Sequence, residues 1–387
     1  MAAIAVDVPR PALRLDGWRY ALAVGALSRV FSIAVLAAIG LARREHGQSP
    51  LDAMLAPFGA WDGIWYQRIA DYGYDPTVAH GNGVAFSPLY PMLVRETAYL
   101  LGSSYLVAGM LVSNVCFLLA IMLVHGLVER RAGARIARTT VWLTAFFPVA
   151  YLFSAVYTES IFLLATVLTF VVLERGAMLG ASVVGSIAVL ARPTGILLAP
   201  TLALRAWRER GDASWWRLAL RAAPILLLPA VYVAFGAYLY YRTGDPFAAQ
   251  SAQAAGWGRG INLLLVIGLP IAILGGIATA LQDVGRLTYI IDTGFAMVWG
   301  LLLLEGLIRR RLPAEYLLYG WLAVILPVLA GTYLALPRYG MGIFVVMWLA
   351  AIHVASRPRL ARWLKVALPV ALIATAVLSL GFERYTP

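Results

Sequence analysis

One aspartate of this chain stands among aromatic residues in a way that favours proton transfer. Asp62 lies in the segment WDGIWYQRIADYGYDP, directly after Trp61 and three residues before Trp65. A carboxylate that loses hydration beside apolar rings accepts a proton more readily than one in water, which suits a general base. We predict that Asp62 is such a base. Two alternatives stay open: His80 as the base, or an aromatic belt that only seals a loop.

Three arginines lie where hydrophobic stretches are interrupted. Arg192 belongs to ARPTG, Arg338 follows Pro337 in LPRYG, and Arg259 comes two residues after Trp257. Guanidinium groups bind phosphate oxygens well, and a break in an apolar stretch directs such a group toward the membrane boundary. We predict that these arginines hold a departing phosphate, in the order Arg338, Arg192, Arg259. The alternative for each is a side chain that only snorkels to lipid headgroups.

Other polar and aromatic residues could hold the hydroxyl groups of a sugar. Glu159 in YTES and Asp245 in TGDP are candidates, although Glu159 could equally be an acid that stabilises the start of a helix. The predicted substrate-binding set is Trp61, Trp65, Tyr66, His80, Tyr90, Glu159, Asp245 and Tyr339. The chain contains no D-x-D or E-x-D pair, and its 4 histidines are scattered. We therefore predict no metal and no other cofactor.

The chain that must position these residues has the composition of a membrane protein. Of its 387 residues, 61% are hydrophobic and 13% charged, and the mean hydropathy is +0.80. Soluble proteins carry about 25% charged residues, so a soluble enzyme is excluded. The single Cys116 excludes a disulfide scaffold.

A helix needs about 20 apolar residues to cross the hydrocarbon. We predict one all-α polytopic domain over residues 1–387, with about eleven spans (give or take two) at 18–41, 105–128, 139–157, 160–175, 177–191, 194–206, 218–241, 290–309, 314–334, 340–356 and 363–381.

The distribution of Lys and Arg predicts how the spans are oriented. With the N-terminus in the cytoplasm, most of the 31 basic residues fall on the cytoplasmic side, which explains the net charge of +12 without a nucleic-acid partner. The extracytoplasmic side then carries two loops, 42–104 with a short interfacial helix, and 242–289. Within the second loop, the apolar stretch 261–281 is expected to be re-entrant or interfacial. Arg29 lies inside the first span, where we expect an acid as its partner or, alternatively, the phosphate of a substrate.

The order of the motifs resembles the PIG-V family, the second mannosyltransferase of GPI-anchor assembly and its bacterial relatives. The resemblance rests on W-D-x-x-W-Y-x-x-I-A-x-x-G-Y followed by F-x-P-L-Y-P, on FFPVAYLFSAVYTES, on ARPTG, on TGDPF with a later WGR, and on PRY. Together these motifs cover roughly residues 16–356. One departure is Ser87, where a second Phe is common in the family. It could alter the acceptor pocket but does not affect the acid.

This resemblance implies a GT-C type glycosyltransferase in a bacterial plasma membrane. Such an enzyme takes a mannose-like sugar from a polyprenyl-phosphate donor on the extracytoplasmic face, and the family's first-loop acid, here Asp62, is its base. The acceptor is a hydroxyl of a lipid-linked glycan, a lipoglycan or a protein. One base without a nucleophile pair predicts inversion at the sugar. The alternatives are a transporter or flippase of lipid-linked sugars and a non-catalytic scaffold. Transporters usually place ionisable residues near the midplane in repeated halves, unlike the outer-edge cluster predicted here.

Overall fold

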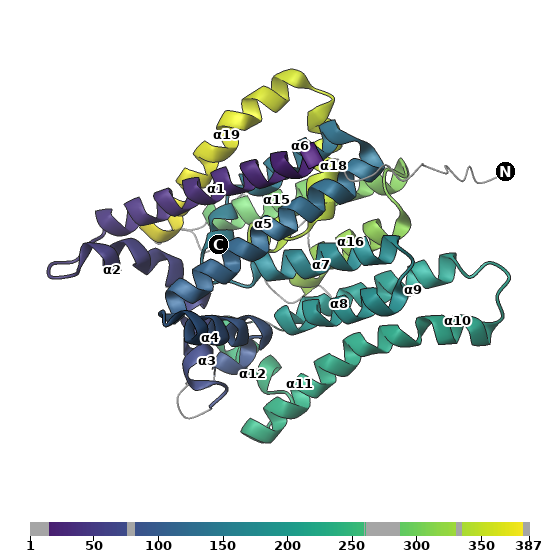
Figure 1. Cartoon of the computed structure of the whole chain (residues 1–387), viewed down its shortest axis with the longest axis horizontal. Coiled ribbons are helices and arrows are strands. Elements are labelled where there is room, and N and C mark those ends of the chain that lie inside the picture. Colours follow the sequence, from purple (N-terminus) through teal and green to yellow (C-terminus); the bar gives the residue numbers. More distant parts are fainter. Residues whose placement is uncertain (1–14, 76–81, 259, 261–286, 330–334, 382–387) are drawn as a thin grey trace.

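The described part of the chain is built from helices. The computed structural model describes residues 15–75, 82–258, 260, 287–329 and 335–381, and within these ranges it contains no β-strand. Most helices lie side by side along the long axis of the molecule (Figure 1). Their bounds are α1 Leu15–Ala42, α2 Pro50–Leu55, α3 Asp62–Tyr72, α4 Leu89–Leu101, α5 Tyr105–Ala132, α6 Ala134–Ala145, α7 Glu159–Glu174, α8 Met178–Ala191, α9 Leu198–Arg208, α10 Trp215–Ala222, α11 Leu227–Thr243, α12 Ala248–Trp257, α15 Leu287–Ile308, α16 Ala314–Leu329, α17 Leu336–Met341, α18 Phe344–Ala355 and α19 Pro358–Ala376.

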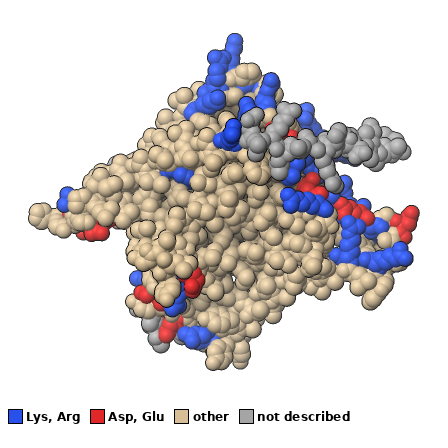
Figure 2. Space-filling model, viewed as in Figure 1, with Lys and Arg blue, Asp and Glu red and all other residues tan. Residues whose placement is uncertain are grey.

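Several helices are apolar enough to lie in a membrane. Four stretches have the length and composition to cross it, namely Gly17–Ala42, Tyr105–Ala132, Trp215–Thr243 and Pro358–Gly381, and shorter apolar helices accompany them. On the face shown in Figure 2, charged side chains gather at the ends of the helices, and the body between them is almost uncharged. The protein is an integral membrane protein, as its composition predicts. The number of spans, about eleven, stays a prediction.

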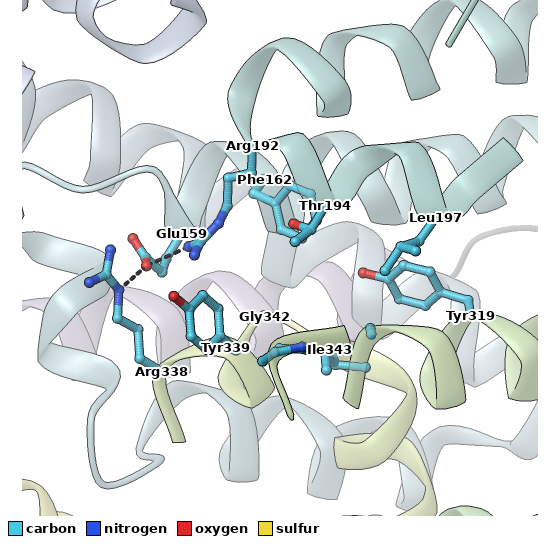
Figure 3. Close-up of a pocket in the computed structure, with 12 residues that line it drawn as sticks. Glu159, Phe162, Arg192, Thr194, Leu197, Tyr319, Arg338, Tyr339, Gly342 and Ile343 are labelled. Carbon is cyan, nitrogen blue, oxygen red and sulfur yellow. Dashed lines mark hydrogen bonds and ion pairs between the residues drawn. The ribbon is translucent and has the colours of Figure 1, made fainter. Parts of the chain in front are cut away.

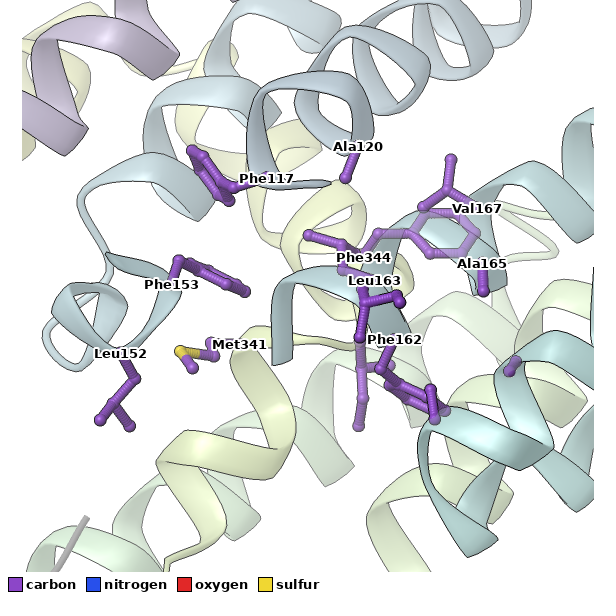
Figure 4. Packing of buried hydrophobic residues seen from close by; sticks show 14 of the residues in the cluster. Phe117, Ala120, Leu152, Phe153, Phe162, Leu163, Ala165, Val167, Met341 and Phe344 are labelled. Carbon is purple, nitrogen blue, oxygen red and sulfur yellow. The ribbon is translucent and has the colours of Figure 1, made fainter. Parts of the chain in front are cut away.

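At the centre of the bundle, α7 is buried along its length, and α5 packs against it, with one face of α5 exposed. A Cβ at Gly25 of α1 would lie 3.1 Å from Ile121 Cγ2, so glycine lets α1 lie close against α5. Phe117 of α5 packs on Phe153 with ring centroids 4.7 Å apart, and Phe344 of α18 is buried in the same apolar cluster (Figure 4). Burying one such ring stabilises the fold by about 1.5–3 kcal/mol. These contacts make the central helices a rigid support for the loops at their ends.

The predicted span 139–157 is wrong in its extent. Helix α6 ends at Ala145, and a short 3-10 turn, Ala150–Ser154, follows before α7 begins. Pro148 lies in this break, and its carbonyl accepts a hydrogen bond from Thr375 of α19. A proline cannot donate to a helical ladder, so the apolar stretch bends here and does not continue as one span.

Arg29 binds this break from within α1. Its guanidinium donates to the carbonyl oxygens of Ala145, at 3.2 Å, and Ala150, at 2.8 Å, and to Ser154 Oγ at 3.0 Å. Its Cζ lies 4.2 Å from the centre of the Phe117 ring. Among the described residues it has no acidic partner, so the expected ion pair is wrong. The free carbonyls of a broken helix are acceptors, and they stabilise the buried cation in place of an acid.

The first loop folds into short helices that pack on the bundle. The predicted helix around Asp62 is α3, which lies beside α4 at one end of the bundle (Figure 1). Tyr66 on α3 contacts the rings of Phe86 and Tyr90 at centroid distances of 5.1 and 5.2 Å. Tyr66 and Tyr90 are both buried. The loop is therefore a packed cap over one end of the helices, and its backbone can hold a side chain in a fixed place.

Candidate active site

Two hydrogen bonds fix the first loop beside Asp62. The Val156 N–H donates to the Phe58 carbonyl at 2.9 Å, and the Tyr157 hydroxyl donates to the Ala60 carbonyl at 3.1 Å. Asp62 follows directly as the first residue of α3. The loop that carries the acid is thus held against the segment that leads into α7, although the two are far apart in sequence.

The backbone immediately before the acid is strained. Trp61 has φ +56° and ψ −123°, a conformation that glycine adopts easily and a bulky residue does not. Holding such a residue there costs about 1–3 kcal/mol, and strain of this kind is concentrated at functional sites. The strained peptide turns the chain into α3 and sets the direction in which Asp62 points.

A proline places the first of two buried arginines. The residue before a proline is biased away from the helical conformation, so α8 ends at Ala191 and Arg192 is extended before Pro193. The Arg192 Nη1 then donates to Glu159 Oε1 at 2.6 Å, and its Cζ lies 5.0 Å from the centre of the Tyr339 ring.

The second arginine joins the two acids. Arg338 on the short helix α17 forms an ion pair from Nη1 to Asp62 Oδ2 at 2.6 Å, and its Nε donates to Glu159 Oε1. Its Cζ lies 4.7 Å from the centre of the Tyr157 ring. Figure 3 shows Arg192 and Arg338 approaching Glu159 from opposite sides. We name Asp62, Glu159, Arg192 and Arg338 the charge network.

Burial distinguishes the roles of the four groups. The exposed fractions of the side chains are 1% for Glu159, 8% for Arg338, 13% for Arg192 and 19% for Asp62. Glu159 Oε1 accepts from both arginines and holds them at a fixed spacing. Asp62 is the acid that a molecule outside the network can reach. The network therefore combines one organising acid, two oriented cations and one accessible carboxylate.

The electrostatics keep Arg338 charged. Burial lowers the pKa of its guanidinium, but Glu159 and then Asp62 raise it by more, and the pKa lies well above its ordinary value. Two cations and two acids leave the network without net charge, which limits the cost of burying it.

A narrow pocket opens beside the arginines. Its cavity volume is about 20 Å³, enough for a water molecule but not for a sugar. Its wall is mostly apolar and comes from α7, α16, α17, the turn that follows α8 and the turn that follows α17, with the residues Glu159, Phe162, Arg192, Thr194, Leu197, Tyr319, Ala323, Pro327, Arg338, Tyr339, Gly342 and Ile343 (Figure 3). Two guanidinium groups at an apolar pocket suit a phosphate that carries a lipid chain, provided that side chains move to widen it.

Four further predicted site residues lie outside the charge network and the aromatic residues of the first loop. Tyr339 lines the pocket and contacts Arg192 of the network. Asp245 does not line the pocket. Its carboxylate accepts hydrogen bonds from the Phe247 N–H at 2.8 Å and from Ser251 Oγ at 3.0 Å, which places it at the start of α12. His80 and Arg259 lie outside the described residues, and so does the predicted re-entrant stretch 261–281.

The aromatic residues of the first loop lie around α3. Trp65 stacks on Phe86 with centroids 6.2 Å apart and is half-buried. Tyr66 reaches the Thr158 hydroxyl at 3.3 Å, and the Tyr90 hydroxyl donates to a carbonyl within the bundle. These rings pack around α3, the helix that begins with Asp62, and so support the position of the acid.

Sequence reasoning missed Tyr157. It joins both halves of the site, because its hydroxyl holds the first loop and its ring lies under Arg338. Its position two residues before Glu159, in a motif already singled out, was the available signal.

Within the described ranges, no group of three or more His, Cys, Asp or Glu side chains could hold a metal ion, and the expectation of no metal stays a prediction.

Comparisons with solved structures give distant likenesses. The chain is similar to the oligosaccharyltransferase of Archaeoglobus fulgidus in complex with zinc and sulfate (14% identity, 94% of this chain and 53% of that one, TM-score 0.46). It is also similar to the AglB oligosaccharyltransferase of that organism in complex with an inhibitory peptide and a dolichol-phosphate (15% identity, 95% of this chain and 55% of that one, TM-score 0.44). A third similar structure is ArnT of Cupriavidus metallidurans bound to undecaprenyl phosphate (15% identity, 94% of this chain and 78% of that one, TM-score 0.43). The chain spans about half the length of the archaeal enzyme.

A family model gives the decisive comparison. No curated protein matches the chain. The family described as Mannosyltransferase (PIG-V) matches residues 37–249, which include Asp62, Glu159 and Arg192. This region is more than half of the chain and confirms the resemblance found in the sequence motifs. The protein belongs to the family of PIG-V mannosyltransferases.

Proposed function

We propose that this protein is a membrane glycosyltransferase that moves a mannose-like sugar from a polyprenyl-phosphate donor to an acceptor hydroxyl. The acceptor is part of a glycolipid, a glycan or a protein, and the reaction takes place at the extracytoplasmic face of a bacterial plasma membrane. Family membership supports the sugar and the type of reaction. The observation that carries the proposal is the charge network, in which two arginines beside an apolar pocket are joined to an accessible carboxylate.

Each part of the network has a task in this reaction. The acceptor oxygen attacks the anomeric carbon, and the bond from that carbon to the phosphate oxygen breaks with its electron pair remaining on the phosphate. Asp62 takes the proton of the acceptor hydroxyl and later releases it to water. Arg338 and Arg192 stabilise the charge that grows on the departing phosphate. With one base and no nucleophile beside it, the displacement is single and inverts the sugar.

The ion pair between Asp62 and Arg338 gives the donor a second effect. In the ion pair, Arg338 Nη1 occupies Asp62 Oδ2, so this oxygen is not free to receive the proton of an acceptor hydroxyl. A donor phosphate that binds Arg338 competes with Asp62 for the same N–H groups. Donor binding thereby frees the carboxylate to accept a proton, so we expect the donor to bind before the acceptor reacts.

The test is sugar transfer by the purified protein in lipid vesicles, with polyprenyl-phosphate mannose as donor. Asp62→Asn keeps the shape but removes the base, and we expect kcat to fall by about 10²–10⁴-fold. Asp52→Asn is the matched control, since Asp52 lies in the same loop, is exposed and is bonded to Ser49. A transporter or a scaffold would give no transfer with any of the three proteins. An α-linked product from a β-linked donor supports inversion, and a β-linked product contradicts it.

A further inference from the structure

A second cavity, much larger than the pocket at the charge network, lies at the opposite end of the same helices. The helix α5 runs from the first loop to Ala132, and α6 returns from there to the break at Ala145. The cavity lies beside the first three turns of α6, where α1 and α19 begin and α18 ends, and its volume is about 420 Å³. The charge network is at the other ends of α6 and α18. The two cavities therefore lie at opposite ends of the helix bundle.

The shape of the cavity follows from the direction of α19. Near its C-terminal end this helix is fastened to the bundle, where Thr375 donates to the Pro148 carbonyl. Toward its first residues it diverges from α1 (Figure 1). The result is a wedge between α19 and the α1–α6 pair that is open where α19 begins and narrows toward the end where α19 is fastened.

Cations line the mouth of this wedge. Arg135 and Arg138 of α6 and Lys365 of α19 line the cavity, and no acid among the described residues lines it. All three are exposed, and within the described ranges none forms an ion pair with an acid. Arg138 lies against Tyr20, with its Cζ 5.3 Å from the ring centre, which orients the guanidinium. Three cations without a protein anion form a site for an external one.

The deeper wall is apolar and holds one unpaired donor. Spacings of three and four residues place Trp142 below Arg138 on α6, and Leu364 lies beside Lys365 on α19. The Trp142 indole N–H is buried and has no hydrogen-bond partner in the part of the chain that the structure describes. A buried donor without a partner is costly, so an acceptor atom at the wall of the cavity would stabilise it.

We infer that this wedge binds an anionic phospholipid from the leaflet opposite to the charge network. The phosphate is held by Arg135, Arg138 and Lys365, and a headgroup or ester oxygen accepts from Trp142. One acyl chain lies between α19 and α6 along Leu364. A lipid fits better than a soluble anion, because the cations lie at the membrane boundary and the apolar wall below them matches a chain. This inference does not depend on the proposed sugar transfer.

The test measures lipid binding to the purified full-length protein in neutral detergent by native mass spectrometry. The probes are phosphatidylglycerol, phosphatidylcholine of the same chain length, and inorganic phosphate. We expect one phosphatidylglycerol to bind at least about tenfold more tightly than phosphatidylcholine. The double variant Arg138→Ala/Lys365→Ala should lose this preference. The control Arg359→Ala/Arg362→Ala removes two exposed cations of α19 that do not line the cavity, and it should keep the preference.

A second variant separates the site from its charge. Ala361→Trp fills the wedge and leaves all three cations in place, and we expect it to abolish the bound phosphatidylglycerol. Thermal unfolding without added lipid confirms that each variant is folded. The inference is overturned if both charge variants lose binding equally, if phosphatidylcholine binds as well as phosphatidylglycerol, or if millimolar phosphate displaces the lipid.

Discussion

The two ends of this protein use arginine in opposite ways. At the charge network, both arginines are bound by acids, Arg338 is buried and Arg192 is largely buried, and the pocket beside them measures about 20 Å³. At the wedge, the cations have no acidic partner within the described residues, are exposed, and line about 420 Å³. Guanidinium groups held by acids are oriented in advance, whereas the others are available to any anion that enters.

This difference indicates what each end can do. Electrostatic catalysis needs dipoles and charges that are fixed before the reaction, because reorienting them costs part of the stabilisation. The charge network meets this condition through Glu159, which fixes both arginines. Lipid binding at a boundary needs net charge and space, and the wedge offers both. Variants that change the charges or contacts at one of these two sites test whether the sites differ in this way.

The largest effect is expected when the arginine that joins both acids is changed. Arg338→Lys keeps the charge, but an ammonium group cannot bind Asp62 and Glu159 with the fixed geometry of a guanidinium. We expect kcat for sugar transfer to fall by about 10²-fold or more. The matched control is Arg309→Lys at the exposed pair with Glu305, which should change the rate by less than about twofold. Full activity of the Arg338→Lys variant would show that fixed geometry is not needed.

The next effect comes from the organising acid. Glu159→Gln leaves two buried guanidinium groups with Asp62 as their single acid, and breaking a buried pair costs about 3–5 kcal/mol. We expect a large drop in the thermal unfolding temperature in detergent and loss of transfer. Glu209→Gln is the control, because Glu209 binds Arg205 and Arg221 at the surface and should cost less than about 1 kcal/mol. Equal stability of the two variants would contradict the assigned role of Glu159.

A smaller effect is expected at Tyr157, which the sequence did not single out. Tyr157→Phe removes the hydroxyl bond to the Ala60 carbonyl and keeps the ring under Arg338. Losing one buried hydrogen bond costs about 1 kcal/mol and loosens the turn before Asp62. We expect kcat to fall several-fold while KM for the donor stays nearly constant, measured by initial rates. A change in donor KM alone would place Tyr157 in donor binding.

The charge network could be predicted from motifs, but its connections could not. Asp62, Arg192 and Arg338 were identifiable because an acid between tryptophans and arginines at breaks are unusual in an apolar chain. The ion pair of Arg338 with Asp62 joins residues far apart in the sequence, and no local pattern encodes such a contact. The predicted partner of Arg29 was wrong for a related reason: free carbonyls of a broken helix bind it, and sequence shows neither the break nor its direction.

The extent of the spans shows the same limit. Hydropathy identifies apolar stretches, and α1 and α5 lie close to the predicted 18–41 and 105–128. It does not distinguish a helix from an apolar turn, which is why it predicts one span over 139–157 although the chain turns at Pro148. The wedge was beyond prediction altogether, because it depends on the angle at which α19 leaves the bundle.

The smallest effect tests whether the two ends also differ in their hydrogen-bond donors. Trp142→Phe removes an indole N–H that has no protein partner, so without lipid it should leave the unfolding temperature nearly unchanged. With phosphatidylglycerol, the variant should gain less stability than the parent protein, by about 0.5–1.5 kcal/mol, the contribution of one hydrogen bond. Trp363→Phe on the exposed face of α19 is the control, and it should respond to lipid like the parent. A lower unfolding temperature of Trp142→Phe without lipid would show that the indole N–H already has an acceptor in the protein. The donor of the wedge would then be satisfied without a ligand, as the arginines of the charge network are.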